Sequence, residues 1–229
     1  MSTVYIVSAP SGSGKSTLVA EILKTVPNLD FSISYTTRRP RGPEQNRKEY
    51  FFVSQQEFDA MVAADEFLEH AIVHGNYYGT ASRFLREAEA RGHDLLLDID
   101  VQGASQIMER IPGAVSIFIL PPDWETLERR LRSRGQDSEE VMRRRLDRAR
   151  REIENYTKYD YILVNNVLEQ SAGQLEDIVL SERLRRSSVG LSEADKRRVE
   201  VAQACRLDRA RERVQPILDS FKPQVVKGT

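Results

Sequence analysis

Apolar residues dominate four short segments of the chain, at residues 4–7, 94–100, 115–120 and 159–166. Runs of this length and composition are typical of strands that are buried on both faces of a sheet. A segment with helical spacing follows each of them, at residues 18–23, 101–111, 124–134 and 172–186. This alternation predicts an α/β fold, in which helices cover both faces of a parallel sheet and the crossovers are right-handed.

The pattern is different between residues 31 and 92. Residues 31–36, 50–53 and 67–73 predict short strands, and residues 75–79 predict a turn. Ser54 and Glu57 have the spacing of a capping box for a helix over 55–64, and a second helix over 82–90 is expected to close at Gly92. Residues 37–49 are rich in Arg, Pro and Gly, which predicts a loop whose cations can reach a ligand.

The last part of the chain is strongly charged. Residues 138–158 predict one long helix before the final strand. From about residue 187 no strand is expected, only a helical stretch over 192–214 that Pro216 and Pro223 break, with a disordered end. Residues 187–229 are therefore interpreted as an extension, with a solvated tail favoured over a dimer arm or an interaction surface.

The turn after the first strand carries a phosphate-binding pattern. Gly12 and Gly14 stand beside Lys15 and Ser16, between a strand and a helix. Glycines let backbone N–H groups approach phosphate oxygens, and the helix N-terminus adds its positive dipole end. The lysine supplies a cation for β- and γ-phosphates, and the serine offers an oxygen to Mg²⁺. The sequence predicts a P-loop that binds a nucleoside triphosphate, although Ala9 replaces the first glycine of the strict pattern.

Two further groups of residues suggest the acceptor. Asp98 and Asp100 end a buried strand, at the sheet edge where ligands gather in open parallel sheets, so both are expected to face the P-loop. The Arg-rich loop, with Tyr50 and Tyr78, offers guanidiniums and phenols that suit a monophosphate. A solvated basic loop is the alternative reading of the same composition.

Composition narrows the function classes. The chain has 229 residues with 34 basic and 35 acidic side chains, so its formal net charge of −1 indicates neither nucleic acid nor membrane as a partner. No apolar run approaches the roughly 20 residues that span a bilayer. With one cysteine, Cys205, and no basic-then-apolar signal at the N-terminus, a cytoplasmic location is expected. The three histidines lack metal-ligand spacing, so no structural zinc is expected.

Seven motifs, which occur in the same order over residues 3–186, resemble those of the guanylate kinases. They are SAPSGSGKS at 8–16, SYTTRRPR at 34–41, GNYYGT at 75–80, LDIDVQG at 97–103, ILPP at 119–122, RGQD at 134–137 and VNN at 164–166. The resemblance implies a P-loop kinase that transfers the γ-phosphate of ATP to GMP, giving ADP and GDP. It also implies a three-layer α/β/α fold with a core (1–33 and 80–186), a GMP-binding segment (about 34–79) and a helical lid (about 124–150).

The resemblance further implies a role for individual residues. Lys15, Arg38 and the lid arginines Arg130, Arg134 and Arg145 are expected to be catalytic. The expected ATP site comprises Ala9, Pro10, Ser11, Gly12, Ser13, Gly14, Lys15, Ser16, Thr17 and Asn165, the last near the adenine. The expected GMP site comprises Ser34, Arg38, Arg41, Glu44, Tyr50, Glu69, Tyr78, Thr80, Asp98 and Asp100. Ser16 and Asp98 are expected to hold Mg²⁺, partly through water.

Within the GMP site, Ser34, Glu69 and Thr80 are expected to read guanine, because a carboxylate accepts from a donor pair that adenine lacks. The chain departs from the family at Gly42-Pro43 and at Asn46-Arg47, where Asn-Gly is common, which leaves the loop path and the role of Glu44 open. Another nucleoside monophosphate kinase and a non-catalytic module are the alternative functions. A monomer or a homodimer is expected.

Overall fold

The computed structural model describes residues 2–73, 75–133, 138–187 and 190–222. The chain divides into two compact units: one comprises Met1–Val7 and Val26–Ser116, and the other comprises Ser8–Thr25 and Ile117–Thr229. Neither unit has a boundary near residue 186, so this division does not test the boundary expected from the family resemblance. The boundary expected between a kinase-like domain (1–186) and an extension (187–229) therefore stays a prediction.

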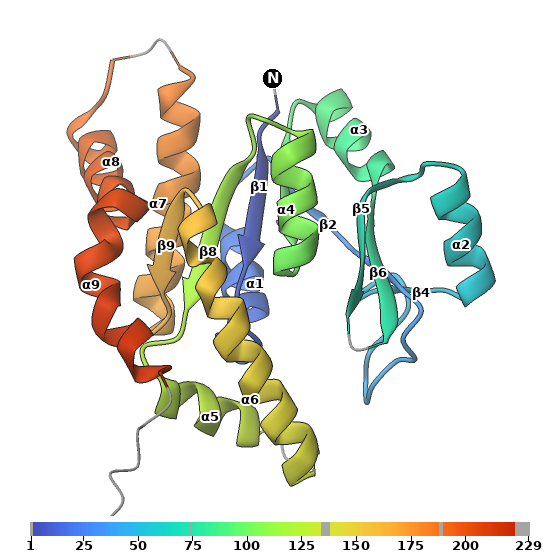
Figure 1. Cartoon of the computed structure of the whole chain (residues 1–229). Helices are drawn as coiled ribbons and strands as arrows, with labels where there is room; N and C mark the ends of the chain where they lie inside the picture. Colours follow the sequence, from blue (N-terminus) through green and yellow to red (C-terminus); the bar gives the residue numbers. More distant parts are fainter. Residues whose placement is uncertain (1, 74, 134–137, 188–189, 223–229) are drawn as a thin grey trace, which may run out of the picture. The chain divides into compact units, whose positions relative to one another are not determined.

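Three parallel strands pair with one another in the first unit (Figure 1). They are β1 (Val4–Ser8), β2 (Leu29–Ser32) and β7 (Asp94–Asp98), in the order β2-β7-β1. Val4 pairs with Leu95 and Leu29 pairs with Asp94, both in parallel register. Every residue of β1 is buried, as the uninterrupted apolar run predicts. Two helices of this unit, α3 (Ser82–Arg91) and α4 (Val101–Arg110), flank β7 in the sequence, and Gly92 closes α3 in the left-handed conformation as predicted.

Four short strands form a second sheet in the same unit. They are β3 (Tyr35–Thr36), β4 (Phe51–Phe52), β5 (Phe67–Val73) and β6 (Asn76–Ala81), in the order β4-β3-β6-β5. The turn predicted over 75–79 is wrong, because β6 pairs along β5 from Val73↔Asn76 to Phe67↔Ala81. The single strand predicted over 31–36 is also wrong, since β2 ends at Ser32 and β3 belongs to the other sheet.

Aromatic side chains form the core of this second sheet. Tyr35, Phe58 and Phe67 are buried together, and Phe58 comes from α2 (Gln55–Ala63). The Phe58 and Phe67 rings stack with centroids 4.6 Å apart. The capping box predicted at the start of α2 is confirmed, because Ser54 and Glu57 bond each other's backbone N–H groups.

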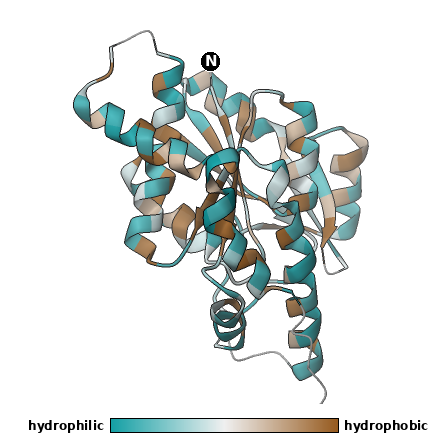
Figure 2. Ribbon diagram, turned by 60° about the vertical axis from the view of Figure 1, so that its left-hand side comes forward, coloured by the Kyte–Doolittle hydropathy of each residue, from teal (hydrophilic) through white to brown (hydrophobic). Residues whose placement is uncertain are grey.

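The second unit carries two parallel strands and most of the helices of the chain (Figure 1). Strand β8 (Val115–Leu120) pairs with β9 (Tyr161–Val164), with Ile117 opposite Tyr161. Its first helices are α1 (Lys15–Thr25), α5 (Trp124–Arg132), α6 (Glu139–Ile153) and α7 (Leu168–Arg185). The helix predicted over 138–158 ends at Ile153, where a 3-10 turn (Glu154–Lys158) replaces it. Figure 2 shows hydrophobic residues on the strands and hydrophilic residues along the outer helices.

Two more helices, α8 (Glu193–Cys205) and α9 (Leu207–Ser220), form the C-terminal part of the second unit. The break predicted at Pro216 is wrong, because α9 runs through it. Ala210, Val214 and Phe221 are buried, and such burial offsets the backbone hydrogen bond that the proline removes. Helix α8 packs along α7, and both α8 and α9 contact β9, so the interpretation of a solvated tail is also wrong for residues 193–221. Pro223 and the end beyond it lie outside the described residues.

Candidate active site

The predicted P-loop has the expected strand–turn–helix setting, and its turn and helix belong to the second unit. Gly12 and Gly14 have φ of +95° and +86°, a conformation that favours glycine. Their neighbours also exclude a side chain: a Cβ at Gly14 would lie 2.3 Å from Asn165 Nδ2, and one at Gly12 would lie 2.9 Å from Leu131 Cγ. Lys15 begins α1. The glycines thus leave the backbone N–H groups of the loop accessible to an anion at the N-terminus of α1.

Hydrogen bonds from Asn165 and Arg130 fix the position of this loop. The Asn165 amide is buried and donates to Ser13 O over 2.7 Å, and Arg130 Nη2 donates to Asn165 O over 3.1 Å. Burial, with Arg129 nearby, lowers the pKa of Arg130. Within the described part of the chain, Arg130 Nη1 and Ser13 Oγ are buried and have no hydrogen-bond partner. Two polar atoms beside the loop therefore have hydrogen-bonding capacity left for a ligand.

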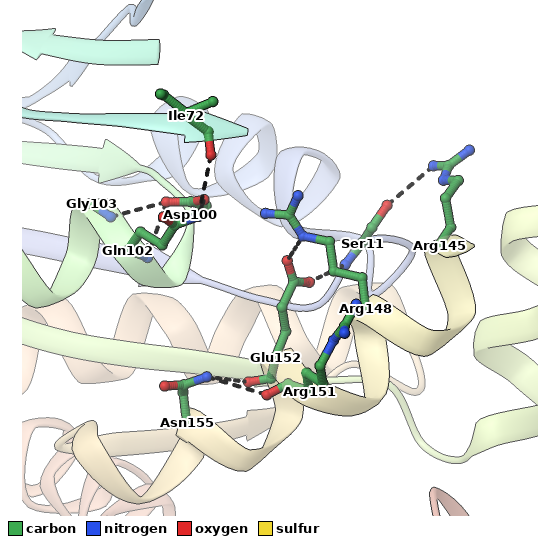
Figure 3. A network of polar contacts seen from close by, with 10 residues as sticks. All are labelled: Ser11, Ile72, Asp100, Gln102, Gly103, Arg145, Arg148, Arg151, Glu152 and Asn155. Carbon is green, nitrogen blue, oxygen red and sulfur yellow. Dashed lines mark hydrogen bonds and ion pairs between the residues drawn. The ribbon is translucent and has the colours of Figure 1, made fainter. Parts of the chain in front are cut away.

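Helix α6 contacts Ser11 of the loop twice (Figure 3). Arg145 donates to Ser11 Oγ over 3.1 Å, and the Ser11 N–H donates to Glu152 over 3.4 Å. Arg148 donates to the other oxygen of Glu152 over 2.5 Å. Arg145 was predicted from the sequence, whereas Glu152 was not. The predicted Arg134 lies outside the described residues.

In the first unit, Arg38 is at the centre of a cluster of predicted acceptor residues. Its guanidinium is buried and makes a bidentate pair with Glu44, with distances of 2.9 and 3.0 Å. Its Nε donates to the hydroxyl of Tyr78 over 3.2 Å, and its Cζ lies 5.2 Å from the centre of the Tyr50 ring. The bond from Arg38 lowers the pKa of Glu44. Burial, with Asp98 nearby, raises the pKa of Tyr50 to about 12.

The loop after Arg38 shows how the chain accommodates its departures from the family pattern. Gly42 has φ of +52°, and Arg47, where glycine is common in the family, has φ of +69°. The Arg41 side chain is exposed, and its backbone N–H donates to Glu44 over 2.7 Å. Glu44 thus contacts two arginines of this segment, Arg38 through its side chain and Arg41 through its backbone.

Glu69 lies in β5 of the same unit and is 3% exposed. Thr80 of the neighbouring strand donates to its carboxylate over 2.6 Å. Burial raises the pKa of Glu69 to about 7, and the nearby Asp100 carboxylate adds to this shift. A Cβ at Gly103 would lie 2.3 Å from Glu69 Oε2, so any side chain at this position of α4 would displace the Glu69 carboxylate. Gly103 ends the motif LDIDVQG at 97–103, but it was not among the predicted site residues.

Helix α4 also covers the free edge of β5. Gln106 both accepts from and donates to the backbone of His70, as a neighbouring strand would, and Arg110 donates to Phe67 O and Leu68 O. Asp100 caps this helix by accepting from the N–H groups of Gln102 and Gly103 (Figure 3). Of the remaining predicted residues, Ser34 precedes β3 and Asp98 ends β7. No sequence pattern singled out Gln106 and Arg110.

Two features are absent from the residues that the structure describes. No group of three or more His, Cys, Asp or Glu side chains is arranged to hold a metal ion. None of the helices there combines the length and the apolar character needed to cross a membrane.

Comparison with known proteins identifies the family. A family model described as guanylate kinase matches residues 1–182. The chain belongs to the guanylate kinase family. A guanylate kinase of Koribacter versatilis is 58% identical over 223 residues, which cover 96% of each chain, and one of Escherichia coli K12 is 51% identical over 81% of this chain and 90% of its own. The guanylate kinase family, and with it the enzyme class predicted from the sequence, is confirmed.

A solved guanylate kinase from Anaplasma phagocytophilum has the same fold. It matches with a TM-score of 0.67 and 36% identity over 79% of this chain and 86% of its own. The predicted P-loop kinase fold with a parallel core sheet is confirmed. The Koribacter guanylate kinase aligns over nearly all of this chain, so its match includes most of the C-terminal extension, for which the sequence motifs gave no family counterpart.

Proposed function

We propose that this guanylate kinase family member transfers the γ-phosphate of ATP to GMP, giving ADP and GDP, with Mg²⁺ bound to the nucleotide. The observation that supports guanine as the acceptor base is the buried Glu69 carboxylate, which Thr80 orients and Gly103 leaves room for. When ionised, this carboxylate accepts from the guanine N1–H and 2-amino groups. Adenine presents no such pair, so a wrong base would leave the buried acceptor unsatisfied.

The phosphate of GMP is assigned to the cluster around Arg38. Arg38 and Arg41 supply cations and forked donors, and Tyr50 and Tyr78 supply hydroxyls. The raised pKa of Tyr50 keeps its phenol protonated and able to donate at neutral pH. Because Glu44 pairs with Arg38, phosphate binding at this guanidinium exchanges one anionic partner for another. Ser34, Asp98 and Asp100 are assigned to the same acceptor site.

The triphosphate of ATP is assigned to the P-loop, residues 9–17. Backbone N–H groups at the start of α1 and the Lys15 ammonium neutralise its charge. Arg130, with its unused buried Nη1, and Arg145, beside Ser11, are the described cations assigned to the transferring phosphate. The Asn165 amide is bonded to Ser13 O, so we assign it to holding the loop in addition to the adenine contact expected from the family.

Ser16 and Asp98 are assigned to Mg²⁺. A serine hydroxyl at the start of α1 and a carboxylate at the end of β7 are oxygen donors of the kind that Mg²⁺ prefers. When bound, the ion supplies charge neutralisation at the phosphates. The attacking oxygen of GMP is already anionic, so no general base is assigned. Catalysis by this chain is then alignment and charge stabilisation by Lys15 and the arginines.

A coupled assay with GMP, AMP, UMP and dTMP as acceptors tests this function. GMP is expected to give the highest kcat/KM, by a factor of about 10⁴ if the unsatisfied-acceptor argument holds. A preference for another monophosphate would favour the alternative of a different nucleoside monophosphate kinase. We also assign the enzyme to the cytoplasm, since its single cysteine, Cys205, can form no disulfide within the chain. Whether it is a monomer or a homodimer stays a prediction.

A further inference from the structure

The C-terminal end of α9 docks onto Trp124, the first residue of α5. The ring of Phe221, which is 4% exposed, meets the Trp124 ring edge to face, with centroids 5.3 Å apart and planes at 82°. The Trp124 N–H donates to Ser220 Oγ over 3.0 Å. The N-cap of α5, Asp123, accepts from the Thr126 N–H, so the Trp124 N–H is a second backbone donor at the start of α5, and its partner lies in the extension.

Trp124 is linked to two helices that contact the P-loop or its support, α5 and α6. The Arg150 guanidinium of α6 lies 4.1 Å from the centre of the Trp124 ring. Further along α5, the Leu127 and Leu131 side chains lie against Gly12, and Arg130 is bonded to Asn165. On either side of Arg150 in α6, Arg145 and Glu152 bond to Ser11 (Figure 3). One aromatic residue thus joins the extension to two sets of P-loop contacts.

The other end of α9 is fixed as well. At the α8–α9 corner, the Leu207 N–H donates to Asp160 O over 2.9 Å, and Arg206 pairs with Tyr161 of β9 as an isolated bridge. The Arg206 guanidinium lies over the Tyr161 ring and donates to its hydroxyl, which bonds the buried Glu182 of α7. Helix α9 is therefore attached at its start to β9 and α7, and at its end to Trp124.

We propose that the extension, residues 193–221, is a brace that holds α5 and α6 against the P-loop through Trp124, with Ser220 and Phe221 as positioning residues for ATP. The proposal rests on the proposed function, because it assigns the P-loop to ATP. The Koribacter relative aligns over this segment as well, whereas the Escherichia coli relative aligns over 81% of the chain.

The test uses Phe221→Ala in the full chain, with Glu212→Ala at an exposed position of α9 as the matched control. Trp124 is the only tryptophan of the chain, so its emission reports the contact directly. In Phe221→Ala we expect emission at longer wavelength, stronger acrylamide quenching, and a KM for ATP that rises by about ten- to a hundredfold, since a displacement of 1 Å far from the chemistry can cost about 10²-fold. The KM for GMP is expected to stay within about twofold, and the control should match wild type in every readout.

A merely structural role gives another result: the active fraction and kcat fall while both KM values stay the same. That outcome would overturn the proposal, as would an equal rise in both KM values. If Phe221→Ala does not fold, Ser220→Ala, which removes the partner of the Trp124 N–H and the bond from the Ser220 hydroxyl to Ile217 O, is judged by the same KM criterion. If wild type does not phosphorylate GMP, the proposed function fails. The brace is then decided separately, by titrating Trp124 emission with a non-hydrolysable ATP analogue in wild type and variant.

Discussion

Replacing Gly103 by alanine tests how Glu69 is positioned. The new Cβ would lie 2.3 Å from Glu69 Oε2 and 2.8 Å from its Cδ, closer than carbon contacts allow. Thr80 holds the other carboxylate oxygen at 2.6 Å, so the group must retreat by about 1 Å or lose this bond. Alanine in a helix gains about 0.5–1 kcal/mol over glycine, but overpacking costs about 1–3 kcal/mol. A net loss of about 1–2 kcal/mol in the free energy of unfolding is expected.

The larger effect should fall on GMP. A hydrogen bond to a charged group contributes about 1.5–3 kcal/mol, so displacing the carboxylate should raise the KM for GMP by about ten- to a hundredfold. Thermal unfolding and steady-state kinetics with GMP and AMP measure both effects. Gly173→Ala, a helical glycine of α7 with open space around it, is the matched control and should raise the melting temperature without changing either KM.

Two outcomes would refute the reasoning about Gly103. One is a KM for GMP within twofold of wild type, with only the melting temperature lowered. The other comes from combining Gly103→Ala with Glu69→Ala: if the glycine acts through Glu69, it should add nothing to the KM for GMP in that background. Additive losses would mean that Gly103 matters for another reason.

Three further predictions concern pH, the P-loop cation and backbone strain. Because burial raises the pKa of Glu69 to about 7, the folded state keeps a proton on Glu69 between about pH 4.5 and 7 that the unfolded state has released, so the free energy of unfolding should fall as pH rises through this window. The KM for GMP should rise about tenfold for each pH unit below 7, because the carboxylate must be ionised to accept from guanine. Glu69→Gln should abolish both trends. Lys15→Ala should lower kcat by about 10²–10³-fold and leave the KM for GMP near its wild-type value in the coupled assay, and unchanged kcat would remove Lys15 from the proposal. Arg47→Gly should raise the free energy of unfolding by about 1 kcal/mol in urea titrations, because Arg47 has φ of +69°, whereas Lys48→Gly should not.

The sequence was most informative where structure is set locally. The strand before Ser8, the two glycines and the helix from Lys15 lie within one short stretch, and their pattern alone predicted the element and its ligand class. Gly92 and the Ser54–Glu57 box were equally readable, because a helix end depends on its own neighbours. The motif order then indicated the family, which the comparisons confirmed.

The errors come from contacts that are distant in sequence. Residues 75–79 have the Gly, Asn and Tyr composition of a turn, but pairing along β5 makes residues 76–81 a strand. Pro216 would end an isolated helix, yet α9 continues because its buried face packs in the second unit. The contact of Glu152 with Ser11 spans 141 residues, and no local pattern encodes it. The roles of the individual site residues stay predictions.

The bidentate pair between Arg38 and Glu44 has a consequence for which anions can occupy the acceptor cluster. Glu44 already neutralises the Arg38 guanidinium, so a small anion that displaces Glu44 only replaces one negative partner of Arg38 with another. Its net binding free energy should therefore be small. A mononucleotide binds more tightly than a free anion, because its base makes additional contacts at the proposed Glu69 site. Inorganic phosphate should therefore compete poorly with a mononucleotide, even where it is abundant.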